Sequence, residues 1–218
     1  MHLILLNARI TKKSFERWSI IKKFSHSTFS LIDKAYSQNT ETNYFLKKLK
    51  VKKITSIGNL KFIEHDTFET NQADKKLFSQ FRKYKTFIAA STHNTEELFA
   101  AKTHILLKKK IKNIITIIIP RHINRVDQII SQINELGLNA ISRRSNKKKL
   151  DNIDIYLVDT FGESKKFYKF ATTVFLGGSI IKRGGQNPLE PARFGAKILH
   201  GPNIDNFRDV YKLSLIHI

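Results

Sequence analysis

The sequence predicts an α/β fold built on a doubly wound, parallel sheet with helices on both faces. Two observations support this prediction. Short apolar segments of strand length alternate with longer segments of helical periodicity along most of the chain. One of the short segments, residues 113–119, is almost wholly apolar, which is typical of a central parallel strand that is buried on both faces.

The first part of the chain, up to residue 63, is expected to form a short alternating series of its own. The predicted strands are residues 3–6, 28–33 and 54–57, and the predicted helices are residues 14–24 and 41–49. From Glu64 to Ala73 the composition becomes polar, and we expect a linker at residues 64–74. The first part is therefore interpreted as separate from the rest.

A second and longer series follows the linker, from residue 75 to about residue 212. The predicted helices are residues 75–84, 95–109, 123–136 and 165–171, and the predicted strands are residues 86–90, 113–119, 154–158 and 172–176. Because strands and helices alternate here without interruption, this part is expected to contain the doubly wound sheet.

Polar or glycine-rich residues follow each of the strands predicted in the second series. They are Ser91-Thr92-His93, Pro120-Arg121-His122, Asp159 to Glu163, and Gly177-Gly178-Ser179. The ligands of open α/β sheets bind outside the carboxyl ends of the strands. The convergence of these residues therefore predicts a binding site at that edge of the sheet.

Taken together, these groups suit a phosphorylated ligand. Arg121 offers a planar fork of donors to a phosphate, and Glu163 or Glu190 can accept hydrogen bonds from ribose hydroxyls or a base. Taken singly, the same residues have simpler explanations. His93 could be a neighbour of a helix cap, and His122 could be a solvated loop histidine. Arg121 could pair with a helix carboxylate, and Glu163 could cap the helix that follows it.

The stretch from Gly177 to Pro191, GGSIIKRGGQNPLEP, contains two glycine pairs, which would let the backbone approach a ligand closely. Asn187 is a favourable N-cap, Pro188 suits the first helical position, and Glu190 completes a capping box. A helix is therefore predicted to begin at Pro188, with its free N–H groups facing the glycine loop as an anion site. The same spacing also fits a well-capped helix after a flexible loop.

The net charge of +21 allows three interpretations: nucleic-acid binding, attraction to an anionic membrane or substrate, or compositional drift in a chain rich in Lys, Ile and Asn. We favour drift, with membrane attraction as a secondary effect, because the basic runs 108–110 and 147–149 lack interleaved aromatic residues. The absence of cysteine excludes disulfides and thiolate metal ligands, and scattered histidines make a metal site unexpected. No apolar run reaches 18 residues, so no transmembrane helix is predicted.

Several short motifs occur in order along the chain. They are NARITKKSFERW (7–18), GNLKF (58–62), ASTH (90–93), PRH with Arg125 (120–125), DTFGE (159–163), FLGGS (175–179), GGQNPLEP (184–191) and GPNIDNF (201–207). As a set, over nearly the whole chain, they resemble the 3-deoxy-D-manno-octulosonic acid (Kdo) transferases of lipid A and lipopolysaccharide biosynthesis. The resemblance implies a two-domain GT-B glycosyltransferase fold.

The same resemblance implies an activity and a set of partners. The enzyme would transfer Kdo from CMP-Kdo to a lipid A precursor and release CMP, at the cytoplasmic face of the cell inner membrane. It implies no metal and no cofactor, because CMP-Kdo is a substrate. The expected partners are therefore CMP-Kdo, the lipid A precursor and the anionic membrane surface, and not nucleic acid.

The resemblance also assigns roles to particular residues. The CMP contacts fall on Pro120, Arg121, Phe161, Gly162, Glu163, Asn187, Pro188, Leu189 and Glu190, and Lys61 matches the lysine that stabilises the transition state. The neighbours expected at the donor site are Ser91, His93, His122, Gly178 and Ser179. Three positions depart from the usual family pattern: Phe161 replaces Met, Ser164 replaces Leu, and Gln186 replaces His.

The general-base glutamate of that family lies in an N-terminal half that we expect to be missing from this chain. Residues 1–63 are interpreted as the end of the acceptor-binding domain, 75–212 as an incomplete CMP-sugar-binding domain, and 213–218 as a non-native tail. Such a fragment is expected to be inactive alone. Two alternatives stay open: another nucleotide-sugar transferase or epimerase of GT-B fold, and a basic nucleic-acid-binding α/β protein.

Overall fold

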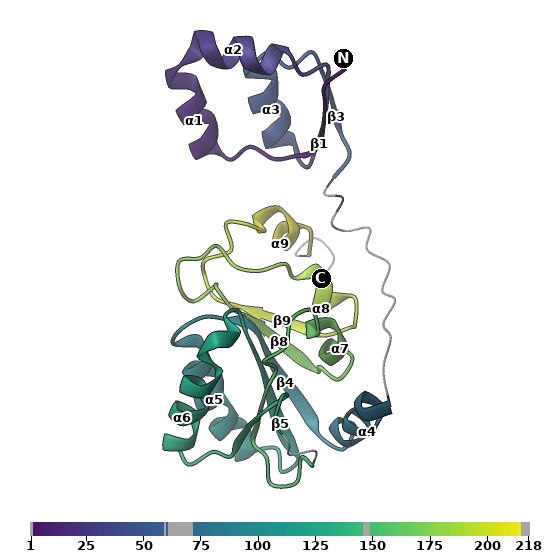
Figure 1. The fold of residues 1–218 in the computed structure, drawn as a ribbon, viewed down its shortest axis with the longest axis vertical. Helices are drawn as coiled ribbons and strands as arrows, with labels where there is room; N and C mark the ends of the chain where they lie inside the picture. Colours follow the sequence, from purple (N-terminus) through teal and green to yellow (C-terminus); the bar gives the residue numbers. More distant parts are fainter. Residues whose placement is uncertain (1, 59, 61–71, 146–148, 215–218) are drawn as a thin grey trace. The chain divides into compact units, whose positions relative to one another are not determined.

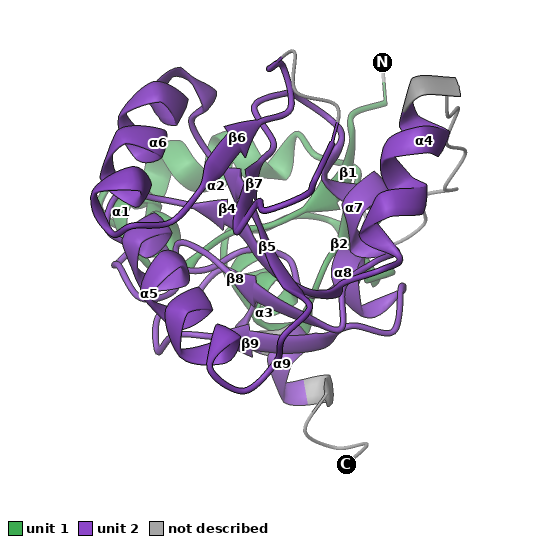
Figure 2. Cartoon of the chain, turned by 90° about the horizontal axis from the view of Figure 1, so that it is seen from below, with its two compact units in different colours: residues 1–67 green, residues 68–218 purple. Residues whose placement is uncertain are grey.

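The computed structural model describes residues 2–58, 60, 72–145 and 149–214. Contacts between residues divide the chain into two compact units, Met1–Thr67 and Phe68–Ile218, which Figure 2 shows in different colours. The linker expected at 64–74 lies outside the described residues up to residue 71. Its last three residues belong to a helix, so the helix expected from Lys75 begins earlier, at Gln72.

The first unit contains a parallel sheet with strand order β1-β2-β3. Its elements are β1 (Ile4–Ala8), α1 (Lys12–Ile20), α2 (Lys22–Ser30), β2 (Lys34–Ser37), α3 (Thr40–Lys48) and β3 (Lys53–Ser56) (Figure 1). The side chains of Ala35 and Leu46 are fully buried between the sheet and α3, and Val51 completes this small core.

The strand predicted at residues 28–33 is wrong. Helix α2 continues to Ser30, and β2 begins only at Lys34. The β-branched and aromatic residues in this stretch favour a strand locally, but tertiary packing decides otherwise. The ring of Phe29 packs edge-on against Trp18 of α1, with 5.2 Å between centroids, and it also packs against the core of the first unit.

The second unit contains a parallel sheet whose described strands follow the order β6-β7-β5-β4-β8-β9. Its elements are α4 (Gln72–Phe81), β4 (Lys85–Thr92), α5 (Glu96–Lys108), β5 (Ile114–Pro120), η2 (Ile123–Arg125), α6 (Val126–Glu135), β6 (Ala140–Ser142), β7 (Ile155–Leu157), α7 (Ser164–Tyr168), β8 (Thr173–Leu176), α8 (Leu189–Ala192), β9 (Lys197–His200) and α9 (Arg208–Ser214). Strands β6 and β9 and helix α9 were not predicted from the sequence.

Helices cover both faces of this sheet (Figure 1). On one face, α5 and α6 contribute Ala100, Ala101, Ile129 and Ile133 to a core that contains Ile118 of β5. On the other face, residues of α4, α7 and α9 pack around strand residues such as Ile117. All seven residues of β5 are buried. This arrangement confirms the predicted doubly wound α/β class.

The helices of both units are short. Across the part of the chain that the structure describes, none combines the length with the apolar composition that a bilayer span requires.

Candidate functional site

The carboxyl ends of β5, β4 and β8 lie side by side, because these strands are parallel neighbours in the sheet. Two backbone hydrogen bonds hold the segments together just beyond the strands. The N–H of Arg121 donates to the carbonyl of Thr92 at 2.9 Å, and the N–H of Gly177 donates to the carbonyl of Ala90 at 2.8 Å. The structure therefore brings together three of the four strand ends that the sequence singled out. The fourth follows β7, which pairs with β5 on its other side.

A buried carboxylate, which sequence reasoning did not single out, lies at the centre of this edge. The side chain of Glu96, the first residue of α5, is fully buried. Its Oε2 accepts hydrogen bonds from the backbone N–H groups of His93 at 3.0 Å and Gly178 at 2.7 Å. Its Oε1 accepts from those of Ser179 at 3.2 Å and Ile180 at 3.1 Å. The N–H groups of the glycine loop thus face the protein's own carboxylate.

Positively charged and imidazole groups gather around the same loop. The rings of His93 and His122 meet edge to face, with 5.6 Å between their centroids. Burial lowers the pKa of His93; the Glu96 carboxylate opposes this shift, while His122, Arg183 and Arg121 lower the pKa further. Neither arginine has an ion-pair partner among the described residues. Their charges are therefore available to an anionic ligand.

Two of the glycines in this region allow chain segments of the protein itself to pack closely, and they do not leave space for a ligand. A Cβ on Gly177 would lie 2.5 Å from the carbonyl oxygen of Ser91, and one on Gly184 would lie 2.5 Å from the Asn206 side chain. Gly178 differs, because it has a φ of +66° and its neighbours are side chains. A Cβ there would meet Arg183 at 3.3 Å, and Gln186 and His93 at 3.5 Å.

Two predicted neighbours of the donor site have structural roles at this edge. Ser179 is fully buried, and its hydroxyl donates to the carbonyl of Leu176 and accepts from the N–H of Gly201. Ser91 has a φ of 54° at an irregularity of β4, where the register with β5 shifts. Both residues shape the loop ends of the neighbouring strands.

The helix predicted after the glycine loop exists but is short. Helix α8 spans Leu189–Ala192, with Pro188 as its N-cap, one residue later than expected. The Oδ1 of Asn187 accepts a hydrogen bond from the N–H of Leu189 at 3.1 Å, so this side chain does satisfy a free donor of the first turn. Glu190 lies near the buried Tyr168 phenol, whose pKa is raised by burial and further by this carboxylate.

The loop after β7 is ordered by an ion-pair network around Glu163. Its Oε2 accepts from Arg143 Nε at 2.7 Å and from the Thr160 hydroxyl. Its Oε1 accepts from Arg143 Nη2 at 3.0 Å and from Lys166 Nζ at 2.9 Å. These bonds, the bidentate one to Arg143 above all, lower the pKa of Glu163 to about 2. Glu163 is thus held ionised, which a simple helix cap would not require.

The network also includes Asp74 on α4, which contacts both Arg143 and Lys166. Sequence reasoning missed Arg143, although it lies just beyond β6, at the same edge as the other strand ends. Within the same loop, the side chain of Phe161 is 78% exposed and Gly162 has a φ of +74°. Both residues are accessible to a ligand at the carboxyl edge.

Lys61 lies outside the described residues, so the structure does not place it relative to this edge. Among the residues that it does describe, no group of three or more His, Asp or Glu side chains is arranged to hold a metal ion.

Comparisons with known proteins identify proteins to which this chain is similar. Residues 1–64 match the model of the family described as 3-deoxy-D-manno-octulosonic-acid transferase (kdotransferase). A 3-deoxy-D-manno-octulosonic acid transferase of Rickettsia bellii is 33% identical over 216 residues, which cover 97% of this chain and 50% of that protein. The protein of the same name from Haemophilus influenzae is 28% identical, over 96% of this chain and 50% of its own length.

The fold has a solved counterpart as well. The crystal structure of the C-terminal CMP-Kdo binding domain of WaaA from Acinetobacter baumannii superimposes with a TM-score of 0.59 at 26% identity, over 65% of this chain and 74% of that one. This likeness confirms the expected fold class, and neither alternative interpretation of the sequence is favoured. The chain spans about half the length of the curated relatives that it matches. Over nearly its whole length the chain is similar in sequence to 3-deoxy-D-manno-octulosonic acid transferases, and it shares the fold of a solved CMP-Kdo binding domain.

Proposed function

We propose that the second unit binds CMP-Kdo and that the protein acts in the transfer of Kdo to a lipid A precursor, with release of CMP. The observation that carries this proposal is the pair of arginines, Arg121 and Arg183, that lie near His93 without ion-pair partners among the described residues. They lie at the carboxyl edge of the sheet, in a chain that resembles a CMP-Kdo binding domain. Two such arginines favour a phosphate as their ligand, because the charge-assisted hydrogen bonds between a guanidinium and a phosphate are strong.

The proposed chemistry is electrostatic. When the bond between the Kdo anomeric carbon and the CMP phosphate breaks, negative charge grows on the phosphate. Preorganised cations such as Arg121 and donors at the start of α8 stabilise that charge without reorganising. Lys61 is proposed to act in the same way. Since these groups supply the positive charge, we propose that the transfer needs neither a metal nor a cofactor.

The nucleoside is proposed to meet the loop 159–163 and the turn before α8. The exposed ring of Phe161 can stack on a cytosine, because every base presents a π-face. The exposed backbone at Gly162 can approach the ribose closely, whereas Pro120 is buried at the end of β5, and we propose that it supports the strand end that carries Arg121. The segment from Asn187 to Glu190 supplies further contacts, with Asn187 already holding the first turn of α8 in place.

CMP titration by calorimetry tests this proposal directly. We expect the 218-residue chain to bind CMP and to discriminate against UMP and AMP. Arg121→Ala should weaken CMP binding at least about tenfold, because charged hydrogen bonds contribute roughly 1.5–3 kcal/mol each. Arg82→Ala, which removes an exposed arginine after α4, is the matched control and should leave binding unchanged. Equal effects of the two substitutions would reduce the role of Arg121 to general charge, and the proposal would fail.

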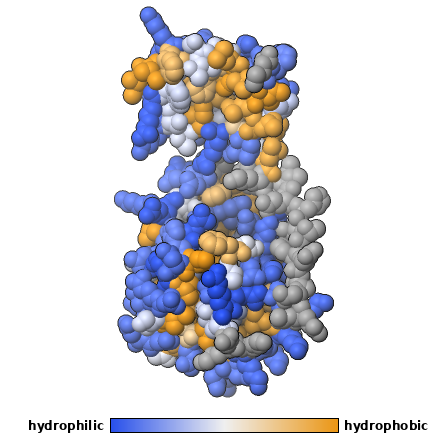
Figure 3. Space-filling view, in the orientation of Figure 1, coloured by the Kyte–Doolittle hydropathy of each residue, from blue (hydrophilic) through white to orange (hydrophobic). Residues whose placement is uncertain are grey.

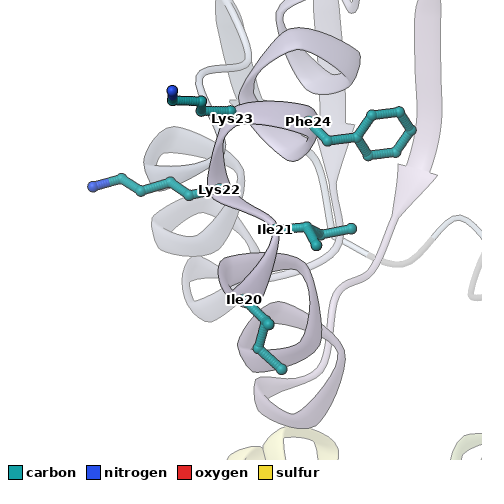
Figure 4. A pocket seen from close by; sticks show the side chains of 5 residues that line it. All are labelled: Ile20, Ile21, Lys22, Lys23 and Phe24. Atoms are coloured by element: carbon teal, nitrogen blue, oxygen red, sulfur yellow. The ribbon is translucent and has the colours of Figure 1, made fainter.

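The lipid acceptor implies a membrane surface, and the first unit offers an apolar, basic corner for it. Where α1 meets α2, the exposed fractions are 83% for Ile20, 50% for Ile21 and 62% for Phe24. These three residues line a shallow hollow together with Lys22 and Lys23, and Figure 4 shows the two lysines pointing away from Ile21 and Phe24. Figure 3 shows apolar residues exposed on this unit. Apolar residues flanked by lysines bind the interface of anionic bilayers.

Sedimentation with lipid vesicles tests the membrane part of the proposal. We propose that the protein works at the cytoplasmic face of the inner membrane, so the chain should bind vesicles containing phosphatidylglycerol better than vesicles of phosphatidylcholine alone. Substituting Ile20 and Phe24 by Ser should abolish the difference. Leu106→Ser is the matched control, because Leu106 is 62% exposed in the second unit. Unchanged binding by the Ile20 and Phe24 variant would exclude this corner.

A further inference from the structure

The Glu96 carboxylate joins the ends of two neighbouring strands. One of its donors, the N–H of His93, follows β4, and the other three, in Gly178, Ser179 and Ile180, follow β8. The side chain reaches across 82 residues of sequence to Gly178. Its position therefore fixes the loops after two paired strands relative to each other, in addition to the backbone hydrogen bond from Gly177 to Ala90.

This bonding pattern accounts for the burial of an acidic side chain. The carboxylate of Glu96 is fully buried, and a buried charge is costly unless it is paired or well hydrogen-bonded. Consecutive backbone N–H groups that converge on one point form an anion-binding concavity of the kind that nucleotide-binding loops use for phosphates. Here the concavity is filled by an anion of the protein itself, so its donors hold the loop and do not reach the ligand.

The consequence for the site is geometric. Gly178, held by Glu96, is the residue around which Arg183, Gln186 and His93 converge, within 3.3–3.5 Å of where a Cβ would lie. If the N–H of Gly178 lost its acceptor, the loop would reorient toward water, and Arg183 and Gln186 would move with it.

We propose that Glu96 is the positioning residue of the donor site: its carboxylate locks the glycine loop and the His93 turn in the conformation that presents the cationic groups to the donor's anionic part. The inference rests on the proposed function, since the ligand is the CMP moiety. Two other roles are conceivable. Glu96 could serve folding alone, or it could be a place-holder that the phosphate displaces from the loop.

The three roles give different results for Glu96→Gln, which preserves the shape of the side chain. Its amide nitrogen would face backbone N–H donors, so the glycine loop would lose acceptors. We expect the variant to fold, to bind CMP at least about tenfold more weakly, and to exchange the amide protons of Gly178 and Ile180 faster. The control is Glu97→Gln. Glu97 is equally buried on the same helix, but it pairs with Arg125 at 3.0 Å and interacts with Thr92 of β4, and among the described residues it makes no hydrogen bond to the glycine loop.

The measurements are CMP titration by calorimetry, amide hydrogen exchange by NMR, and thermal melts of wild type and both variants. Glu97→Gln should lower the melting temperature and leave CMP affinity and the loop amides unchanged. If Glu96→Gln behaves like Glu97→Gln, the role is purely structural and the inference is overturned. Tighter CMP binding by Glu96→Gln would show a place-holder and would overturn it equally.

Two further results separate this inference from the function on which it rests. A wild-type chain that does not bind CMP overturns the proposed function, whereas wild-type binding with an unaffected Glu96→Gln overturns the inference alone. Should Glu96→Gln fail to fold, Glu96→Asp takes its place. It retains the charge but falls one methylene short of the loop, and the same loss of CMP affinity and of amide protection is expected.

Discussion

Arg143 holds Glu163 with two nitrogens at once, Nε at 2.7 Å from Oε2 and Nη2 at 3.0 Å from Oε1. The side chains of both residues are 15% exposed. The same guanidinium contacts Asp74 and lies 5.7 Å from the centre of the Phe167 ring. One arginine thus connects α4, the end of β6 and the loop before α7. The conformation of that loop, to which the nucleoside is proposed to bind, depends on this connection.

Replacing Arg143 should destabilise the second unit. Arg143→Met removes the guanidinium that bonds the carboxylates of Glu163 and Asp74, and breaking a buried ion pair costs about 3 kcal/mol or more. Arg143→Lys should recover little of this loss, because an ammonium group lacks the planar fork that meets both oxygens of a carboxylate. Urea unfolding of the three proteins measures the effect. Full stability of the lysine variant would contradict the two-point contact.

The depressed pKa of Glu163 predicts an acid-labile contribution to stability. The folded-state pKa is about 2, below the ordinary value of 4.5, because Arg143, Thr160 and Lys166 bond the ionised form. The contribution is therefore complete above about pH 4.5 and is lost as the pH falls toward 2. Its upper bound is on the order of 3 kcal/mol. Glu163→Gln removes this titration, so its stability deficit should be largest at pH 6 and should shrink toward pH 2. A deficit independent of pH in urea unfolding experiments would refute the assignment.

The sequence predicted those strands whose own side chains are mostly apolar, because such strands are buried in the sheet. Strand β5, expected at 113–119 and observed at Ile114–Pro120, is apolar except for Thr116, because helices cover both of its faces. Strand β9, Lys197–His200, gave no such signal. It lies at the edge of the sheet, and Leu199 is 51% exposed. Such a strand is held mainly by backbone pairing with β8, which leaves no pattern in the side chains.

The same distinction applies to the site. His93 and Arg121 could be named from the sequence. Parallel strands all bring their carboxyl ends to one edge of the sheet, even when the order of the strands is not known. Glu96 and Arg143 could not be named in this way. Glu96 bonds Gly178, which lies 82 residues away, and Arg143 bonds Asp74, which lies 69 residues away. No pattern of neighbouring residues in the sequence predicts such distant pairs. The glycine motif was recognised, but whether its donors face a ligand or the chain itself is a tertiary property.

Alanine substitutions at two glycines, Gly195 and Gly201, test the cost of backbone strain and the cost of a steric clash separately. A Cβ on Gly201 would lie 2.4 Å from the carbonyl oxygen of Ser179, while Gly195 has a φ of +75° and open space around it. Gly195→Ala should cost about 1 kcal/mol, the usual cost of a left-handed conformation for an L-residue. Gly201→Ala should cost about 3 kcal/mol or more, because the backbone of two loops must separate. Urea unfolding compares them, and equal costs would show that the loop joining β9 to Ser179 is soft.

Thr160 is predicted to compete with the nucleotide for Glu163. A carboxylate has about four acceptor positions, and those of Glu163 are taken by two nitrogens of Arg143, by Lys166 and by the Thr160 hydroxyl. The hydroxyl is the one uncharged donor among these four contacts. A ribose hydroxyl that bonds Glu163 would therefore replace Thr160.

Thr160→Val keeps the branched shape and vacates that position, so CMP should bind as tightly as to wild type or several-fold more tightly. Glu163→Gln should weaken CMP binding about tenfold, because a charged hydrogen bond is lost. In the double variant the gain from Thr160→Val should be reduced or absent, since the carboxylate that it frees is no longer there. Thr172→Val, at an exposed threonine before β8, controls for the loss of a hydroxyl. Calorimetric titration with CMP, and with 2′-deoxy-CMP as a second ligand, decides the matter. If Thr160→Val weakens CMP binding as much as Glu163→Gln does, Thr160 itself holds the nucleotide, and Glu163 acts by ordering the loop.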